Sequence, residues 1–504
     1  MIRFFPQNIY ASFPQNIYAS SGIALLRALR ATAASLLAFF LLTELPALAD
    51  TGRVVAHPAQ IFRGWGMSLA WEANDLYGGG RQGALIKDPQ LQSRYMDLLY
   101  GEPTARLTLG LNIARYNIGG GDDPTHASMR ADAQMDGFQA GPTAAFDWSR
   151  DVAQRRMLQE AKNRGANIFE AFSNSPPYWM TKNGSSSGGT APHQDNLRPD
   201  MRERFVEYLT TVVRHFRDVE GLRFESLEPF NEPDLSWTAG GIQEGYSASY
   251  ESQNALIPIL AARLKRNGLD TFVSGVDMNN VADAISGLGQ LDPRALSALG
   301  RLNTHDYHLV NHPAQLQHYR ALARKLRKPI WMSEIGCCFA QQGDGTEIWG
   351  ALFIADSVRM DLRDLGCEAW FLWQSDWNVI AFDTKGGPPR PQKQFYAIAQ
   401  YTRFIRPGFQ IISAGGANNT LAAYSPATKR LVLVSTNWEK ATVNDVDLSA
   451  FDRLPSSASV YRTTAADTVN LEQGSISLSS KSHITDELPA RSITTYVVDG
   501  VSPR

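Results

Sequence analysis

The sequence predicts a (β/α)8 barrel, or TIM barrel, followed by an antiparallel β-sandwich. Between Ile61 and Gln374, short apolar runs alternate with long amphipathic stretches, and after Pro407 the helical periodicity stops. Strand patterns that alternate with helix patterns indicate a parallel sheet with helical crossovers, and eight repeats are typical of a closed barrel. A doubly wound open sheet is the alternative, and the number of strand candidates disfavours it.

The eight apolar runs are the expected barrel strands. They lie at Ile61–Gly66, Asn112–Ile118, Asn167–Phe172, Phe224–Phe230, Phe272–Asp277, Leu302–Tyr307, Ile330–Ile335 and Ala369–Trp373. The early repeats are longer than the late ones, so we expect the additional residues in the loops that follow the early strands. Such loops build the face of a barrel on which active sites lie.

Amphipathic stretches between the runs are the expected helices. They lie at Ser149–Arg164, Met201–Val219, Ser252–Arg266, Ala314–Arg327 and Glu347–Leu365. In the second of these, Phe205, Leu209 and Val212 recur at helical spacing, which indicates one apolar face.

Residues 409–504 contain β-rich segments separated by turn-rich gaps. Strands are predicted at Thr420–Tyr424, Arg430–Thr436, Ser459–Arg462 and Ser492–Val498. We therefore assign residues 50–406 to the barrel and 407–504 to the sandwich, and we expect residues 51–60 to add a strand to the sandwich.

Residues 1–49 have the pattern of a secretory signal peptide. Arg27 and Arg30 precede the apolar run Ala31–Leu42, and Ala47-Leu48-Ala49 forms an A-x-A cleavage site before Asp50. The run is shorter than the roughly 20 apolar residues of a membrane span, which disfavours the alternative of an uncleaved anchor. We expect a secreted or periplasmic protein that begins near Asp50 and has no stable membrane insertion.

The charge and the cysteine content exclude some other classes of protein. The chain has 48 Lys and Arg against 50 Asp and Glu, a net charge of −2, whereas nucleic-acid binding favours a basic groove. Three cysteines are too few for a disulfide framework. Cys337 and Cys338 are expected to be buried thiols, with a vicinal disulfide as the alternative, and Cys367 is expected to lie too far from Cys337 to form a bridge.

Two glutamates at the ends of predicted strands are the catalytic candidates. Glu232 follows the fourth strand and Glu334 ends the seventh. These strands lie across a barrel from each other, so both carboxyls are expected to converge over its mouth. Two carboxyls about 5–5.5 Å apart serve a retaining glycosidase as nucleophile and general acid/base. Two ordinary surface or salt-bridged glutamates are the disfavoured alternative.

The neighbours of Glu232 fit the same chemistry. Asn231 is placed to donate to a sugar 2-hydroxyl, a contact that strengthens in the transition state. Pro233 is expected to keep Glu232 extended, because the residue before a proline avoids helical geometry.

Longer motifs around these residues resemble a known glycosidase family. Asn231-Glu232-Pro233 with Ser333-Glu334 is similar to the retaining clan of (β/α)8 glycosidases. The segments Gly64–Trp71 and Asn174–Thr181 resemble glycoside hydrolase family 30, and most of all its endo-β-1,6-galactanase-like branch. The resemblance runs from Gly64 to the C-terminus, since this family carries a β-sandwich beside its barrel. Fungal members tend to have a second Trp after Trp71, whereas Glu72 follows here. This difference concerns the assignment of the substrate and not the chemistry.

The resemblance implies roles for further residues near the two glutamates. Glu232 would be the acid/base and Glu334 the nucleophile. Arg115 would hydrogen-bond the nucleophile or a sugar hydroxyl, with a structural ion pair as the alternative. Asp122 would bind a hydroxyl in the non-reducing subsite, and Asn174 would add a polar contact.

Four residues at the ends of the sixth and eighth strands complete this set. Tyr307 would contact the nucleophile, and His305 would be either a ligand contact or a wall residue. Trp373 and Trp377 would stack on a sugar ring; core packing is the alternative for Trp373 and the favoured interpretation for Trp71. We expect Glu334 to stay ionised with the help of Arg115, and Glu232 to be held protonated by its neighbour's charge.

The implied function is a secreted, retaining endo-glycosidase acting on β-1,6-galactan. The alternatives are a β-1,6-glucanase, a xylanase, a glucosylceramidase-like hydrolase or an inactive carbohydrate-binding protein. Sugar binding by the sandwich is a further possibility, with Trp438 as its lone candidate, and core packing is the favoured interpretation of Trp438. We expect a polysaccharide or oligosaccharide substrate, no cofactor, no metal, no nucleic-acid partner and a monomer. Gly184–Gly188 matches the G-x-S-x-G pattern of serine hydrolases but lies in a Gly/Ser-rich loop, so we interpret it as a chance match.

Overall fold

A computed structural model of the protein describes residues 50–122, 128–307, 313–336, 347–376, 378–382, 387–478 and 482–504. The predicted signal segment 1–49 lies outside these ranges, as do Cys337, Cys338 and Trp377. Cys367 is a free, buried thiol. No helix in the described ranges is long and apolar enough to span a membrane.

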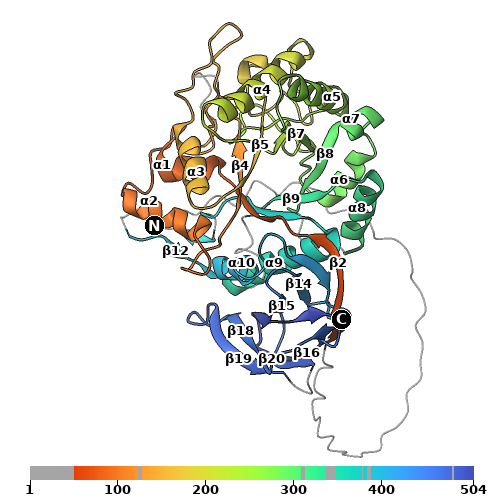
Figure 1. The fold of residues 1–504 in the computed structure, drawn as a ribbon. Helices are drawn as coiled ribbons and strands as arrows, with labels where there is room; N and C mark the ends of the chain where they lie inside the picture. The colour runs from red at the N-terminus through yellow and green to blue at the C-terminus, as the bar shows by residue number, and fades with distance from the viewer. Residues whose placement is uncertain are drawn as a thin grey trace, which may run out of the picture. The chain divides into compact units, whose positions relative to one another are not determined.

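Eight parallel strands close into a barrel in the order β10-β3-β4-β5-β6-β7-β8-β9, which confirms the predicted fold class (Figure 1). The strands are β3 (Gly64–Ser68), β4 (Ile113–Asn117), β5 (Ile168–Phe172), β6 (Ser226–Glu228), β7 (Phe272–Gly275), β8 (Leu299–His305), β9 (Ile330–Ile335) and β10 (Ala369–Leu372). All eight predicted runs overlap these strands.

The helices of the chain include all those that were predicted. They are α1 (Ala70–Tyr77), α2 (Pro89–Tyr100), α3 (Val152–Asn163), α4 (Arg202–Asp218), α5 (Tyr250–Arg266), α6 (Val281–Leu288), α7 (Pro293–Ala298), α8 (Pro313–Leu326), α9 (Glu347–Met360) and α10 (Lys393–Thr402). In α4, Phe205, Leu209 and Val212 are buried, as their spacing predicted. The helix predicted at Glu347–Leu365 changes at Asp361 into a π-helical turn, Asp361–Leu365, which ends at Gly366 in a left-handed conformation.

The start of the first barrel strand differs from the prediction. Ile61 is the last residue of β2 (Val55–Ile61), which pairs with β13 of the sandwich, and β3 begins only at Gly64. Gly64 has φ +148°, and a side chain there would clash with Asn112. The apolar run thus contains two strands in different sheets, because a glycine at a close contact separates them.

The sandwich contains strands from both sides of the barrel in the sequence. A seven-stranded sheet has the order β19-β18-β21-β15-β14-β13-β2, and a three-stranded sheet has the order β1-β16-β20. Besides β2, the strands of these two sheets are β1 (Asp50–Arg53), β13 (Gln410–Ser413), β14 (Thr420–Ser425), β15 (Arg430–Asn437), β16 (Thr442–Asp447), β18 (Ser457–Thr464), β19 (Glu472–Ser477), β20 (His483–Leu488) and β21 (Ser492–Asp499). Residues 51–60 therefore contribute to two strands of the sandwich.

Strand β15 shows how the sandwich joins the barrel. Leu431 and Leu433 pack into the core between the two sheets, whereas Val432 and Val434 belong to the same apolar cluster as the barrel. This alternation follows from the two-residue period of a strand. Helix α9 contacts β15 and β21, and α10 contacts β18 and β21, so two barrel helices cover the outer face of the large sheet.

Candidate active site

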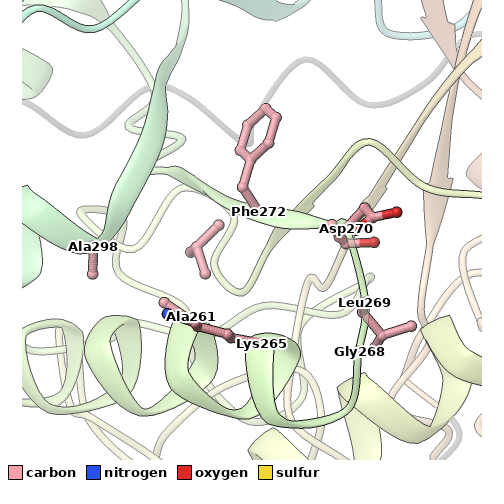
Figure 2. A pocket seen from close by; sticks show the side chains of 9 residues that line it. Ala261, Lys265, Gly268, Leu269, Asp270, Phe272 and Ala298 are labelled. Atoms are coloured by element: carbon pink, nitrogen blue, oxygen red, sulfur yellow. The ribbon is translucent and has the colours of Figure 1, made fainter.

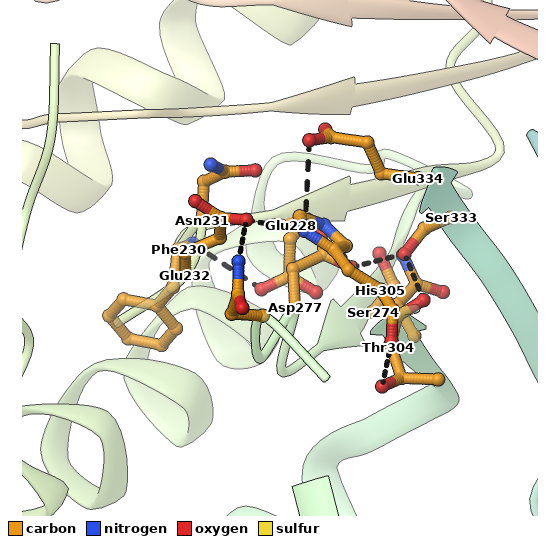
Figure 3. A network of polar contacts seen from close by, with 12 residues as sticks. Glu228, Phe230, Asn231, Glu232, Ser274, Asp277, Thr304, His305, Ser333 and Glu334 are labelled. Carbon is orange, nitrogen blue, oxygen red and sulfur yellow. Dashed lines mark hydrogen bonds and ion pairs between the residues drawn. The ribbon is translucent and has the colours of Figure 1, made fainter. Parts of the chain in front are cut away.

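The two candidate glutamates lie on either side of His305 (Figure 3). Glu232 lies four residues beyond the end of β6, and Glu334 lies in β9. A carboxylate oxygen of each and a ring nitrogen of His305 lie within 4.8 Å of one another. Both glutamates are buried. This separation is close to the roughly 5–5.5 Å that a retaining double displacement requires.

Glu334 is held at both carboxylate oxygens. The Tyr307 hydroxyl donates to Oε1 over 2.8 Å, and Arg115 Nη1 donates to Oε2 over 2.6 Å. Burial raises the pKa of Glu334 above its ordinary value, and the charges of His305 and Arg115 act in the opposite direction. The sequence predicted that Arg115 stabilises the ionised form of Glu334, but it did not predict that burial raises the pKa of this glutamate.

Glu232 is fixed through its backbone in a conformation that the sequence did not predict. Its φ is +46°, in the left-handed region, whereas Pro233 predicted an extended residue. The Glu232 N–H donates to the Asp277 carbonyl over 2.7 Å, and the Glu232 carbonyl accepts from Leu235 N at 3.1 Å and Trp237 Nε1 at 2.8 Å. These three bonds outweigh the local preference, and backbone strain of this kind is concentrated at functional sites.

Arg115 on β4 is fully buried and connects several groups of the site. It donates to Glu334, to Asp277 Oδ2 over 2.6 Å and to Asn231 Oδ1 over 3.3 Å. Its guanidinium carbon lies 3.5 Å from the centre of the Phe172 ring. Arg115 therefore contacts the candidate nucleophile Glu334 and also forms a buried ion pair with Asp277. The two roles considered for Arg115 in the sequence analysis are compatible with each other.

His305 at the end of β8 is a buried cation among carboxylates. Its Nδ1 lies 3.2 Å from Glu232 Oε1 and 3.7 Å from Glu334 Oε1, and its Nε2 lies 3.6 Å from Asp277 Oδ1. Burial alone would lower the pKa of His305, but the charges of Glu334 and Asp277 and a hydrogen bond to Glu232 raise it to about 10. The imidazole is therefore protonated at neutral pH.

Glu232, His305 and Glu334 are also the one cluster of His, Cys, Asp and Glu side chains within the described ranges that is close enough to hold a metal ion. A protonated imidazole has no free lone pair for a metal, and Arg115 already donates to Glu334. The donor set therefore fits proton transfer better than metal binding.

Asn174 and Asp122 lie in the loops that follow β5 and β4. The Asn174 N–H donates to Asn117 Oδ1 over 3.3 Å, and its buried side-chain oxygen has no hydrogen-bond partner among the described residues. Glu244, from the loop after β6, accepts from Gly120 N at 2.8 Å and from Asn117 Nδ2 at 3.3 Å. Burial, opposed by these two bonds and aided by the charge of Asp122, raises the pKa of Glu244 to about 8. Glu244 thus ties the loop of Glu232 to the loop of Asp122.

Trp373 follows β10 and is 4% exposed. Its ring meets Trp71 edge to face with centroids 4.9 Å apart, and Phe172 lies 6.5 Å away in the same way. Trp71 is buried in the same cluster, as expected. The stacking of Trp373 on a sugar ring stays a prediction, and Trp377 lies outside the described residues.

Two residues beside the candidate glutamates, Asp277 and Asn279, were not predicted from the sequence. Asp277 accepts from Arg115, and Arg115 and His305 lower its pKa to about 2 against the effect of burial. Asn279 Nδ2 donates to Glu232 Oε1 over 2.6 Å. Both lie at or just after the C-terminal end of the predicted fifth strand, so applying the strand-end rule to every strand would have found them.

A cavity of about 300 Å³ lies at the opposite end of the barrel strands. Ala261 and Lys265 of α5 line it together with Phe272, the first residue of β7, and Ala298, which precedes β8 (Figure 2). Because the two glutamates lie at the C-terminal ends of their strands, this cavity is separate from the site.

Known proteins match most of the chain. A family model described as O-Glycosyl hydrolase family 30 matches residues 56–295. An endo-beta-1,6-galactanase from Hypocrea rufa is 31% identical over 408 residues, which cover 77% of this chain and 81% of that protein. An exo-beta-1,6-galactobiohydrolase from Bifidobacterium longum subsp. longum is 26% identical over 383 residues, which cover 57% of this chain and 24% of that protein.

The fold also matches a solved structure of the same family. The catalytic domain of GH30 xylanase C from Talaromyces cellulolyticus has a TM-score of 0.66 and 19% identity, and the match covers 89% of this chain and 100% of that chain. The family model and the extensive match to the galactanase assign the family, and the closed barrel with its sandwich agrees with it. The chain belongs to glycoside hydrolase family 30.

Proposed function

We propose that the protein is a retaining endo-glycosidase that cleaves β-1,6-linked galactan. The observation that carries the mechanism is the distance of at most 4.8 Å between carboxylate oxygens of Glu232 and Glu334. An inverting enzyme needs its carboxyls about 6.5–9.5 Å apart, so that a water fits between carboxylate and sugar. The short distance leaves room for direct attack on the sugar.

In the first step, Glu334 acts as the nucleophile. A carboxylate oxygen of Glu334 attacks the anomeric carbon, the bond from that carbon to the glycosidic oxygen breaks, and Glu232 gives its proton to the departing oxygen. Arg115 and Tyr307 hold Glu334 at both oxygens, which orients it for attack. We expect Asn231, whose side-chain oxygen accepts from Arg115, to donate to the 2-hydroxyl of the same sugar.

In the second step, the roles reverse. Glu232 takes a proton from a water molecule, the oxygen of this water bonds to the anomeric carbon, and Glu334 leaves as a carboxylate. The buried imidazolium of His305 lies beside both glutamates and stabilises whichever of them is ionised.

The substrate assignment is supported by two relatives whose names state action on β-1,6-galactan or its fragments. The family also includes a xylanase of the same fold, so related β-linked polymers are the comparison substrates. From its N-terminal sequence pattern, we also propose that the protein is exported from the cytoplasm.

Variants of the two glutamates test the mechanism. We expect Glu334→Gln and Glu232→Ala each to lower kcat on β-1,6-galactan at least about 10³-fold without loss of folding. Azide should restore turnover of an activated aryl glycoside in Glu232→Ala, because this small anion attacks the sugar without a general base. Substantial hydrolysis by either variant would contradict the proposal.

A panel of polymers tests the substrate. The proposal predicts that β-1,6-galactan is cleaved in preference to β-1,6-glucan and to xylan, and that oligosaccharides of several lengths appear early. Preferred cleavage of xylan or glucan would overturn the galactan assignment and leave the two-glutamate mechanism intact. Release of one product size only would indicate exo-action instead.

A further inference from the structure

Asn279 connects the loop of Glu232, the proposed acid/base, to Tyr307, which donates to the proposed nucleophile Glu334. The Asn279 backbone N–H donates to the Asp234 carboxylate at 3.1 and 3.3 Å, and its carbonyl accepts from Tyr307 N at 3.2 Å. Its side-chain Nδ2 donates to Glu232 Oε1 over 2.6 Å. The residue is 9% exposed. The backbone of Asn279 is therefore held on both sides, and its side-chain amide contacts Glu232.

This geometry distinguishes the two oxygens of Glu232. Oε1 faces Asn279 Nδ2 at 2.6 Å and His305 Nδ1 at 3.2 Å. An amide nitrogen and a protonated imidazole can only donate hydrogen bonds. A proton on Oε1 would therefore oppose two donors. Among the described residues no donor contacts Oε2, so that oxygen can carry the proton without opposing a donor.

We propose that Asn279 is a positioning residue that directs the transferable proton of Glu232 to Oε2; this inference rests on the proposed function. In the first step that proton passes from Oε2 to the glycosidic oxygen, which keeps the electron pair of the broken bond. In the second step Oε2 takes a proton from the attacking water. Asn279 remains hydrogen-bonded to Oε1 in both steps.

His305 does not replace Asn279 in this role. Its Nδ1 lies between Glu232 and Glu334, at 3.2 and 3.7 Å, and is shared by both carboxylates. The other charged groups near Glu232 are Asp234 on its own loop and Glu334 on β9. Asp277, two residues beyond β7, accepts from the Glu232 N–H through its backbone carbonyl, and Arg115 on β4 donates to the neighbouring Asn231. Asn279 is thus the neutral donor that acts on Glu232 alone.

The alkaline limb of the pH profile tests this role. The limb of kcat/KM reports the loss of the proton from the acid in the free enzyme. Removing a donor to the carboxylate favours the protonated form, so in Asn279→Ala we expect this limb to move upward by about one pH unit. We also expect kcat on β-1,6-galactan to fall about tenfold with KM changed less than twofold, because the carboxyl can now turn its proton away from the substrate.

A neighbouring asparagine provides the matched control. Asn280 caps α6 by accepting from Asp283 N at 3.0 Å and makes no described contact with Glu232. Asn280→Ala should lower the melting temperature and leave the pH limb in place. If Asn279→Ala does not fold, Asn279→Leu keeps the branched shape without the donor and should shift the limb in the same direction.

The outcomes separate this inference from the proposed function. An unshifted limb in a folded Asn279 variant, with Glu232→Ala inactive, would overturn the positioning role and leave the mechanism standing. A Glu232→Ala enzyme with wild-type activity would instead remove the mechanism on which the inference rests. A shifted limb in the Asn279 variants and not in Asn280→Ala supports the role.

Discussion

At the scale of single residues, the site is organised around two buried cations. Arg115 and His305 lie among Glu232, Glu334 and Asp277, and each contacts at least two of these carboxylates. Buried carboxylates are costly without such partners. The two cations therefore allow three acidic side chains to share one small, buried region.

The first prediction concerns the charge of His305. Its pKa of about 10 is above the ordinary 6.5, so the imidazolium stabilises the folded protein fully below pH 6.5 and this contribution is lost as the pH rises through 10. In NMR of histidine-labelled protein, assigned with His305→Gln, the His305 ring signal should stay in its protonated position to beyond pH 8. A titration near pH 6.5 would contradict this account.

The second prediction concerns the shape of Arg115. A lysine carries the charge but cannot donate at once to Glu334, Asp277, Asn231 and Ser68, as Arg115 does. Arg115→Lys should lower kcat about 10²-fold. Arg63→Lys is the matched control, since Arg63 pairs with Glu225 away from the mouth of the barrel. Equal losses of kcat in both variants would show that Arg115 acts only through stability.

The residues that were predicted from sequence share one property. Glu232, Glu334 and Tyr307 stand at strand ends inside recognisable motifs. Asn279 has no motif around it, and its role depends on the backbone partners Asp234 and Tyr307, which are distant in sequence. The conformation of Glu232 could not be predicted for the same reason, because three bonds to other segments or to its own turn override the preference set by Pro233.

At the scale of elements, a buried polar layer lies inside the barrel beneath the site. Arg301 on β8 donates to Glu170 on β5, and its guanidinium carbon lies 3.2 Å from the centre of the Trp331 ring. Asn303 and Ser274 also donate to Glu170. Because all these groups are buried and paired, the layer fixes the relative positions of strands that carry the candidate catalytic residues above it.

The third prediction tests this layer. Arg301→Leu leaves the buried Glu170 without its main cationic partner, so it should lower the free energy of unfolding by about 3–5 kcal/mol. Arg430→Leu breaks the exposed pair with Asp499 and should lower it by about 0–1 kcal/mol. Urea unfolding followed by circular dichroism measures both changes. Similar small losses in the two variants would contradict the structural role of the layer.

Element positions were predicted well where one element corresponds to one run of residues. The runs at Ile330–Ile335 and Asn167–Phe172 match β9 and β5 to within one residue. The run at Ile61–Gly66 overlaps β3, but its start was wrong because Ile61 belongs to another sheet, and an apolar pattern does not show which sheet a strand joins. The polar layer was also missed, because its charged residues lie inside strands rather than at strand ends.

At the scale of the whole described chain, the barrel and the sandwich share one apolar cluster. Leu352 and Ile398 of the barrel helices belong to the same cluster as Val432 and Ile493 of the large sheet. Hydrogen bonds reinforce this interface, including Gln400 Nε2 to Thr463 Oγ1 at 2.9 Å. Strand β2 precedes the barrel but pairs with β13, which follows it. Without the other part, the barrel and the sandwich would each expose apolar side chains of this cluster.

The fourth prediction follows from this shared core. Calorimetry of the intact protein should show one cooperative unfolding transition rather than two. A protein that ends at about Pro407 would expose the apolar faces of α9 and α10 and should be insoluble or aggregated. A soluble truncated barrel that keeps activity, or two separate transitions in the intact protein, would contradict a common core.

The central claim is that Glu232 and Glu334 perform a double displacement on one sugar. The most direct test is the anomeric configuration of the first product, observed by proton NMR in the opening minutes of β-1,6-galactan hydrolysis, before mutarotation. Two successive inversions at the anomeric carbon predict that the new reducing end appears as the β-anomer and converts slowly to the equilibrium mixture. An α-anomer as the first product would contradict the claim, because it requires a single displacement by water.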